Sequence, residues 1–248
     1  MSGETTPRVA VFRPDDERTV EAVALLESLG ADPVADPMLA IEETGAVPRT
    51  DADVVIFTST TGAGCLPAGW SPGDATVCAV GPSTAEALRE TGIHVDLVPE
   101  TYSSAGLVEA LRGGTGIEIP GGGTGIEPLG GEAGVGGTRV EVARSDHGSD
   151  VLLDGLDDAG AYHHETVLYR LVRPDGAGAS ADLAAAGDLD AALFTSSLTV
   201  EHFLAAAADR GVREAATEGL QDAVVGAIGE PTRETATAEG IAVDVVPG

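Results

Sequence analysis

The sequence predicts an α/β protein of two domains, each with a parallel β-sheet flanked by helices. Short apolar runs alternate with helix-like segments along the 248 residues, which is the pattern of parallel sheets. The runs lack the apolar–polar alternation of a half-exposed sheet, so we expect strands that are buried on both faces. The pattern also occurs twice in the chain, which indicates an internal duplication.

The duplication is clearest in two stretches, "AVGPSTAEALRETGIHVDLVP" (79–99) and "AIGEPTRETATAEGIAVDVVP" (227–247). They align without a gap, and 10 of 21 positions are identical. A second match sets "DADVVIFTSTTGA" (51–63) over "DLDAALFTSSLTV" (188–200). A weaker third match sets "RVAVFRPDD" (8–16) over "RVEVARSDH" (139–147), with "LESLGA" (26–31) over "LDDAGA" (156–161) after a one-residue shift. Each half therefore contains three strand–helix units in the same order.

Glycines end the predicted helices. "TVEAVALLESLG" ends at Gly30, "STAEALRETG" at Gly92 and "VLLDGLDDAG" at Gly160. Two strand-like stretches, 36–44 and 164–172, interrupt the alternation at equivalent places in the two halves. We expect them to connect the two domains.

The glycine-rich stretch 113–137 repeats GTGIE and superficially resembles a nucleotide-binding loop. It lacks the GK[ST] ending of a phosphate loop, and no GxGxxG motif lies between a strand and a helix. We interpret it as a flexible surface insertion that contributes little to either core.

The composition is strongly acidic. The net charge is −28, from 41 acidic residues and 13 basic residues that are all arginine. Nucleic-acid binding has little support without a basic surface. The acidity fits a solvated surface in concentrated salt, where the Debye length falls to about 3 Å at 1 M. An acidic binding face is the alternative.

No charged-then-apolar leader precedes Val9, and no apolar run approaches the roughly 20 residues that span a bilayer. The sequence therefore predicts a cytoplasmic protein without membrane contact, with Cys65 and Cys78 as reduced thiols in or near the core. No metal site is expected, because the five histidines lack ligand spacing. His163 and His164 are expected on the solvated surface.

Four predicted strands end in small turns that open helices. These turns are Thr58-Ser59-Thr60, Gly81-Pro82-Ser83-Thr84, Thr195-Ser196-Ser197 and Gly229-Glu230-Pro231-Thr232. In an open parallel sheet such turns lie at the carboxyl edge, where ligands bind. Backbone N–H groups and the helix dipole favour anions there. Plain helix capping is the alternative for each turn, but two matched pairs favour a polyanionic ligand.

In their order and spacing, the motifs resemble the uroporphyrinogen-III synthase family. The matching pieces include "VIFTSTTGA", "CAVGPSTAEALRETGI", "VPETYSSAGLVEAL", "ETVLYRLVRP", "ALFTSSLTVEHFL" and "VGAIGEPTRETATAEGI". The resemblance runs from Val9 to Pro247, apart from the glycine-rich insertion. It implies flavodoxin-like halves joined by two antiparallel crossing strands.

The resemblance also implies discontinuous domains. The first domain is expected at 1–37 plus 175–248, and the second at 38–174 with the insertion at 113–137. A simple tandem split near residue 130 is the alternative.

The reaction implied by the resemblance closes linear hydroxymethylbilane into uroporphyrinogen III, with loss of water and inversion of the last ring. It serves tetrapyrrole (haem, sirohaem, cobalamin) biosynthesis and uses no cofactor. We expect a monomer whose only partner is this substrate. A non-catalytic tetrapyrrole- or anion-binding module of the same fold is the alternative.

The resemblance also suggests site residues. The family's cleft tyrosine falls on Tyr169, which we take as the candidate proton donor, and its helix-opening threonines fall on Thr84 and Thr232. The predicted substrate-binding set is completed by residues of the four turns and by two arginines after matched strands: Thr58, Ser59, Ser83, Thr195, Ser196, Gly81, Gly229, Arg13 and Arg144. The arginines could equally be plain surface residues. Glu230 departs from the family pattern by putting a negative charge beside Thr232.

Overall fold

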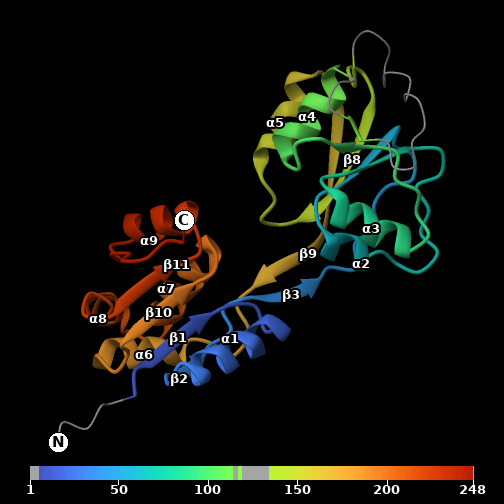
Figure 1. Ribbon diagram of the computed structural model, residues 1–248. Helices are drawn as coiled ribbons and strands as arrows, with labels where there is room; N and C mark the ends of the chain where they lie inside the picture. Colours follow the sequence, from blue (N-terminus) through green and yellow to red (C-terminus); the bar gives the residue numbers. More distant parts are fainter. Residues whose placement is uncertain (1–5, 114–116, 119–133, 248) are drawn as a thin grey trace, which may run out of the picture. The chain divides into compact units, whose positions relative to one another are not determined.

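The structure is a computed structural model that describes residues 6–113, 117–118 and 134–247 (Figure 1). The chain divides into two compact units. Unit 1 consists of Met1–Ala40 and Val172–Gly248, and unit 2 of Ile41–Leu171. The sequence predicted boundaries after residues 37 and 174.

Unit 1 has a four-stranded parallel sheet in the order β11-β10-β1-β2. The N-terminal strand β1 lies beside β10, far away in the sequence (Figure 1). The elements of unit 1 are β1 (Arg8–Phe12), α1 (Glu17–Ser28), β2 (Asp32–Ala35), α6 (Ala179–Ala186), β10 (Ala191–Phe194), α7 (Ser197–Asp209), α8 (Arg213–Gly219), β11 (Val224–Ala227) and α9 (Glu230–Ala238).

Unit 2 contains a five-stranded sheet in the order β3-β9-β8-β4-β5, in which β9, β8, β4 and β5 are parallel. Its elements are β4 (Val54–Phe57), α2 (Thr60–Gly64), β5 (Thr76–Ala79), α3 (Pro82–Glu90), β6 (Val98–Pro99), α4 (Ser104–Gly113), β7 (Ile117–Glu118), β8 (Arg139–Ser145) and α5 (Asp150–Asp158). Strands β3 (Ala40–Glu43) and β9 (Tyr162–Val172) carry the chain out of unit 1 and back, and their arrows point opposite ways in Figure 1.

The predicted α/β class with parallel sheets is confirmed. The glycine stops are also confirmed, since Gly30, Gly92 and Gly160 follow their helices with φ between 73° and 87°. This left-handed conformation strains any residue with a Cβ atom, which explains why glycine ends the helices.

The two sheets differ in how completely their faces are covered. In unit 2, alternate residues of β4 enter two separate core clusters, with Val54 and Ile56 in one and Val55 and Phe57 in the other. Unit 1 has one main cluster, centred on the stacked rings of Phe12, Phe194 and Phe203. The prediction of strands buried on both faces is therefore right for β4 and wrong for β10, which alternates between buried and half-buried residues.

Most of the glycine-rich stretch 113–137 lies outside the described residues. Its described end contradicts the prediction of little core contribution, because Val135 is fully buried in a unit 2 core cluster with Leu107 and Val140. The burial of Val135 could not be predicted, because the surrounding glycine-rich stretch has no periodic pattern of apolar residues.

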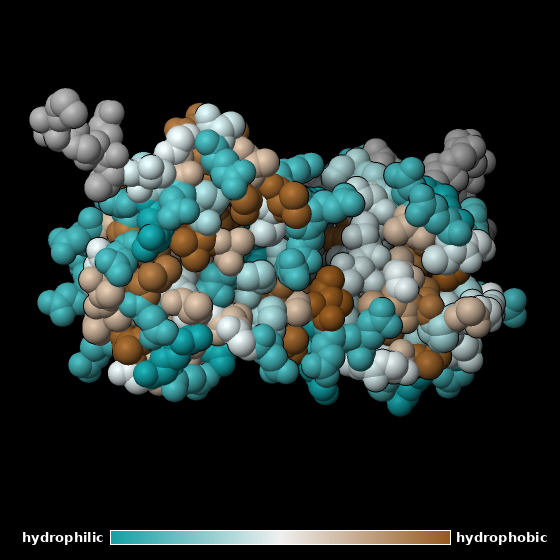
Figure 2. All heavy atoms as spheres, turned by 90° about the horizontal axis from the view of Figure 1, so that it is seen from below, coloured by the Kyte–Doolittle hydropathy of each residue, from teal (hydrophilic) through white to brown (hydrophobic). Residues whose placement is uncertain are grey.

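The surface mixes polar and apolar side chains. Figure 2 shows one face of the molecule, where hydrophilic residues are interspersed with apolar ones. No helix within the described residues is long and apolar enough to cross a membrane.

Candidate functional site

The four predicted turns lie at the carboxyl ends of parallel strands within their own units. In unit 2, one turn joins β4 to α2 and another joins β5 to α3, and β4 pairs with β5. In unit 1, the equivalent turns follow the paired strands β10 and β11. Each unit therefore presents two helix N-termini at one edge of its sheet.

The turns after β4 and β10 are capped by their own serines. Ser59 accepts a hydrogen bond from the Gly62 N–H at 3.0 Å, and Ser196 accepts one from the Thr199 N–H at 3.2 Å. In the second turn Thr195 donates to the Phe12 carbonyl at 2.8 Å. These interactions satisfy groups that a helix start leaves open, so capping accounts for much of the hydroxyl content here.

The turns after β5 and β11 have no side-chain cap. Gly81 and Gly229 occupy the N-cap positions of α3 and α9, in extended conformations that any residue can adopt. Neither helix start receives a side-chain hydrogen bond at its cap from the described residues. The first-turn N–H groups and the positive end of the helix dipole therefore remain available to an anion.

The third residue of both uncapped helices is a buried threonine. Thr84 is 4% exposed and Thr232 is 3% exposed. Within the described residues, no hydrogen bond joins either hydroxyl to another group. Both side chains thus place an unpaired hydroxyl beside an uncapped helix N-terminus.

Two other helices carry a buried threonine at the same position, but there the hydroxyl is hydrogen-bonded. The Thr19 hydroxyl donates to the Pro14 carbonyl and the Thr199 hydroxyl donates to the Ser196 carbonyl, each at 2.6 Å. The hydroxyls of Thr19 and Thr199 are therefore already bonded to backbone carbonyls. The contrast separates Thr84 and Thr232 from threonines that merely help to close a helix start.

Two further turn residues remain open to ligands. Ser83 is exposed, and the half-buried Thr58 makes no side-chain hydrogen bond to another described residue. Tyr102 packs against the Gly81 turn, since a Cβ atom on Gly81 would lie 3.4 Å from the Tyr102 Cβ. No sequence pattern singles out Tyr102, because Gly81, against which it packs, lies some twenty positions earlier in the chain.

Tyr169 on β9 reaches one of the capped turns. Its hydroxyl is hydrogen-bonded to the Ser59 Oγ at 3.0 Å, and its side chain is largely buried. This contact brings the candidate proton donor to the carboxyl end of β4, within unit 2. The hydroxyl–hydroxyl pair can transfer or orient a proton at that edge.

Asp146 adds a charge to the same edge of unit 2. Its Oδ1 accepts hydrogen bonds from the Leu171 N–H at 3.0 Å and from the His147 ring at 2.9 Å. Burial acts to raise the pKa of Asp146, but the hydrogen bonds from His147 and Leu171 outweigh it and leave the pKa below its usual range.

The two candidate arginines have very different surroundings. Arg144 is buried, and its Nε donates to Glu165 Oε1 at 2.7 Å while its Nη1 donates to the Ser149 carbonyl at 2.8 Å. The alternative of a plain surface arginine is therefore wrong for Arg144, whose guanidinium already has internal partners. Arg13 forms no ion pair with the described residues, and its buried Nε has no hydrogen-bond partner among them.

The charge expected beside Thr232 is balanced within its own helix. Glu230 accepts a hydrogen bond from the Arg233 Nε at 2.9 Å, and this guanidinium holds the pKa of the carboxyl below its usual range. The uncapped start of α9 therefore does not face an unpaired carboxylate from Glu230.

The histidine prediction needs correction. His163 and His164 are both half-buried, and the His164 Nδ1 lies 2.8 Å from Oε2 of the fully buried Glu141. Thr166 also donates to Glu141. This polar group lies toward the start of β8, away from the turns, and the sequence could not reveal it because β8 and β9 pair across a long connection.

In the part of the chain that the structure describes, no cluster of three or more His, Cys, Asp or Glu side chains is placed to hold a metal ion. Both cysteines are free, and Cys78 lies in the core as predicted, where burial raises the pKa of its thiol. Neither observation adds a residue to the turns.

Comparison with known proteins identifies the relatives of this chain. Residues 20–248 match the family described as uroporphyrinogen-III synthase HemD. A relative from Methanothermobacter thermautotrophicus, whose name as a uroporphyrinogen-III synthase is provisional, is 33% identical over 249 residues. That match covers 94% of this chain and 90% of the relative.

Solved structures resemble the fold over nearly the whole chain. A variant uroporphyrinogen III synthase from Thermus thermophilus gives a TM-score of 0.64 at 20% identity, covering 98% of this chain and 93% of that one. A uroporphyrinogen-III synthetase from Helicobacter pylori gives 0.56 at 15% identity, covering 98% and 92%. At these identities the likeness concerns the fold alone.

Proposed function

The chain belongs to the uroporphyrinogen-III synthase family, and we propose that it converts hydroxymethylbilane into uroporphyrinogen III. In this reaction the linear tetrapyrrole loses water and closes with its last ring inverted. The observation that carries the proposal at the level of residues is the pair of uncapped helix starts at which the largely buried residues Thr84 and Thr232 have hydroxyls without a hydrogen-bond partner in the described structure.

The chemistry of the substrate matches these turns. Every pyrrole of hydroxymethylbilane carries an acetate and a propionate, so the molecule is a flexible polyanion. An uncapped helix start offers N–H donors and a positive dipole end, and the threonine adds a hydroxyl donor. We assign Thr84, Thr232, Ser83, Gly81 and Gly229 to carboxylate binding, with Thr58 and Arg13 as further donors.

The remaining residues of the predicted set contribute less directly. Ser59, Thr195 and Ser196 hold their turns through internal hydrogen bonds. Arg144 positions the loop after β8 through Ser149, because its guanidinium is already paired with Glu165. We therefore leave Arg144 out of the substrate contacts.

Catalysis in this proposal depends chiefly on positioning. Loss of the hydroxyl from the first ring as water requires one proton and leaves an azafulvene cation. The last ring then attacks through its substituted carbon to give a spiro intermediate, which fragments and recloses in the inverted sense. Tyr169, with its proton held near Ser59, is the candidate donor in the first step. Binding of its carboxylates would keep the tetrapyrrole folded for the attack.

The test is to supply freshly prepared hydroxymethylbilane in molar salt and to separate the product isomers. The proposal predicts mainly the type III isomer without added metal or cofactor. Formation of the type I isomer alone, at the rate of the enzyme-free control, would refute it. Tight substrate binding without turnover would instead indicate a non-catalytic binding module.

A further inference from the structure

Strand β9 contains an extra residue directly before Tyr169. Its register against β8 is regular as far as Arg144, which lies opposite Val167. The next residue of β8, Ser145, lies opposite Tyr169. Leu168 is therefore the extra residue between the two pairs, which makes a β-bulge. Bulges are rare between parallel strands, and they are over-represented next to active sites, where they re-aim a side chain.

The bulge turns Tyr169 toward the face of the sheet that carries α2. Side chains alternate between the two faces of a regular strand, so Leu168 and Tyr169 would point opposite ways. Instead, both belong to the core cluster that contains Phe57. Both also lie beside Gly62 of α2, since a Cβ atom there would be 3.5 Å from the Leu168 Cδ1 and 3.9 Å from the Tyr169 Cε1. Without the extra residue, Tyr169 would point to the opposite face, away from its partner Ser59.

Thr44 holds the bulge from the neighbouring strand. It directly follows β3, which lies next to β9 in the sheet. Its backbone N–H donates to the Leu168 carbonyl at 3.0 Å, and its hydroxyl donates to the Val167 carbonyl at 2.6 Å. The same hydroxyl accepts a hydrogen bond from the Ala46 N–H at 3.1 Å, which helps to orient it. Thr44 thus binds the two carbonyls of β9 that directly precede Tyr169.

The other end of the bulge is fixed by the loop after β8. The Asp146 N–H donates to the Tyr169 carbonyl at 3.3 Å, and the Leu171 N–H donates to the Asp146 Oδ1 at 3.0 Å. The backbone is therefore held on both sides of Tyr169, by Thr44 before it and by Asp146 after it. All of these residues lie in unit 2.

We propose that Thr44 is a positioning residue for Tyr169. By holding the bulge, the Thr44 hydroxyl keeps the Tyr169 hydroxyl at Ser59, at the sheet edge to which the proposed function assigns the substrate. The inference rests on that proposed function for the chemical role of Tyr169, but the position of the tyrosine can be measured without any substrate. Strand β3, which carries the chain between the units, then also supports the site.

The first experiment measures kcat for formation of the type III isomer in molar salt. Thr44→Val keeps the shape and removes the hydroxyl, so kcat should fall about tenfold while KM changes by less than about twofold. Thr44→Ser keeps the hydroxyl and should retain most of the kcat. In Tyr169→Phe no tyrosine hydroxyl remains to be positioned, so adding Thr44→Val should lower kcat by less than about twofold. Equal losses in the two backgrounds would overturn the proposal, since Thr44 would then act independently of Tyr169.

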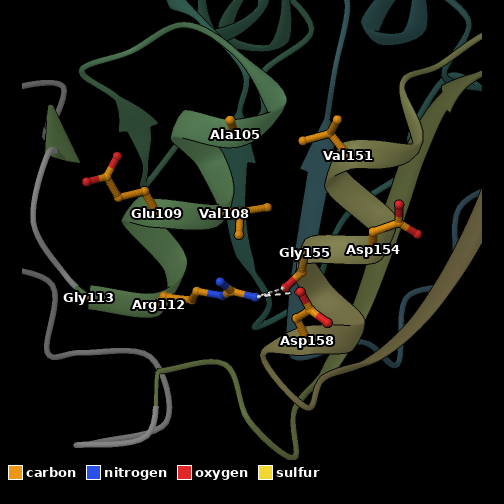
Figure 3. A pocket seen from close by; sticks show the side chains of 9 residues that line it. All are labelled: Ala105, Val108, Glu109, Arg112, Gly113, Val151, Asp154, Gly155 and Asp158. Atoms are coloured by element: carbon orange, nitrogen blue, oxygen red, sulfur yellow. Dashed lines mark hydrogen bonds and ion pairs between the residues drawn. The ribbon is translucent and has the colours of Figure 1, made fainter.

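Two control variants remove a side-chain hydrogen bond to a backbone carbonyl elsewhere in unit 2. Thr138→Val loses the bond to the Val135 carbonyl at 2.7 Å. Arg112→Met loses the bond to the Gly155 carbonyl at 3.0 Å, which Figure 3 shows between α4 and α5. Thr138→Val should lower the melting temperature about as much as Thr44→Val does, and neither control should change kcat. A matching loss of kcat in the controls would overturn the proposal, because any weakening of unit 2 would then slow the reaction.

The second experiment follows Tyr169 directly and needs no substrate. The chain has three tyrosines, so protein labelled with tyrosine carrying ¹³C at Cζ gives three NMR resonances, and Tyr169→Phe identifies that of Tyr169. Thr44→Val should shift or broaden this resonance, whereas Thr44→Ser and Thr138→Val should leave it in place. An unmoved resonance in Thr44→Val would overturn the proposal. Thr44→Cys, whose thiol is a weaker donor, replaces the valine variant if that variant does not fold.

The two experiments separate this inference from the proposed function. A protein that forms no type III isomer, while Thr44→Val moves the Tyr169 resonance, would refute the proposed function and leave the positioning role intact. A protein that forms the isomer, while the resonance stays in place in Thr44→Val, would refute the positioning role alone.

Discussion

The turns after β4 and β10 and the turns after β5 and β11 have similar sequences but different hydrogen bonding. In the first pair a serine caps the helix, at Ser59 or Ser196. In the second pair glycine occupies the cap position, at Gly81 or Gly229, and no described side chain replaces the cap. A hydroxyl-rich turn can therefore be structural or open to a ligand, and the residue at the cap position distinguishes the two cases.

The threonines sharpen the same comparison. Thr19, Thr84, Thr199 and Thr232 all occupy the third position of a helix and are all buried. Within the described structure, Thr19 and Thr199 alone among the four donate to a backbone carbonyl. The four threonines share residue type, helix position and burial. Two of their hydroxyls are bonded to the backbone, whereas the hydroxyls of Thr84 and Thr232 can still bind a ligand.

The largest expected effect is a loss of kcat when the Tyr169 hydroxyl is removed. It would show that a turn capped by its own serine also takes part in catalysis, so that capping alone does not separate structural turns from functional ones. Tyr169→Phe removes the hydroxyl that lies against Ser59. If this hydroxyl delivers the proton for water loss, kcat should fall about 100-fold or more. Steady-state formation of the type III isomer measures this.

Tyr162→Phe is the matched control, because Tyr162 lies on the same strand and is exposed. It should leave both kcat and the melting temperature unchanged. An unaltered kcat in Tyr169→Phe would make Tyr169 a packing residue and restrict the chemistry to the uncapped turns.

The next effect concerns the two equivalent arginines. Arg144→Met leaves Glu165 without its partner in a largely buried site, so the free energy of unfolding should fall by about 2–3 kcal/mol. Arg13→Met breaks no ion pair in the described structure and should change stability by less than about 0.5 kcal/mol. Urea unfolding in molar salt checks both values. Equal losses would mean that Arg13 has a structural role as well.

Exchanging the cap residues should produce a smaller effect. Ser196→Ala should cost about 1 kcal/mol of unfolding free energy. Gly229→Ser should gain a few tenths of a kcal/mol, and the space is available because a Cβ atom there meets only Pro231 at 3.9 Å among the described residues. The new hydroxyl would compete for the N–H groups offered to the substrate, so KM should rise. A Gly229→Ser variant with unchanged KM would show that this helix start does not bind substrate.

The smallest effect depends on pH. The lowered pKa of Asp146 contributes stability above the carboxyl's unfolded-state pKa, near 4, and this contribution is lost as pH falls through the folded pKa. Asp146→Asn should therefore reduce stability at neutral pH by under about 1 kcal/mol. The difference from the unchanged protein should disappear in acid. A constant difference across the pH range would contradict this explanation.

Local features made the fold predictable from the sequence. Apolar runs, helix-stopping glycines such as Gly30 and Gly92, and the repeat identified the units without any tertiary information. The repeat also pointed to both pairs of turns. The roles of the individual turn residues stay predictions, because hydroxyl-rich sequences serve capping and ligand binding equally well.

Features that depend on distant partners were missed. The burial of Arg144 depends on Glu165 across a pair of strands, and Glu141 is paired with His164 in the same way. The apolar runs predicted strands buried on both faces, which holds for β4 but not for β10, because burial depends on what packs above each sheet. The suggested adaptation to concentrated salt likewise stays a prediction.

The most direct test of the account compares threonine-to-valine changes, since valine keeps the shape and removes only the hydroxyl. Thr84→Val and Thr232→Val should each reduce turnover at least tenfold, because a hydrogen bond to a charged group is worth about 1.5–3 kcal/mol, and melting should hardly move. Thr199→Val should instead lose about 1 kcal/mol of stability and keep its turnover. The opposite result, normal turnover with lost stability in Thr84→Val and Thr232→Val, would make all four threonines structural and contradict the account.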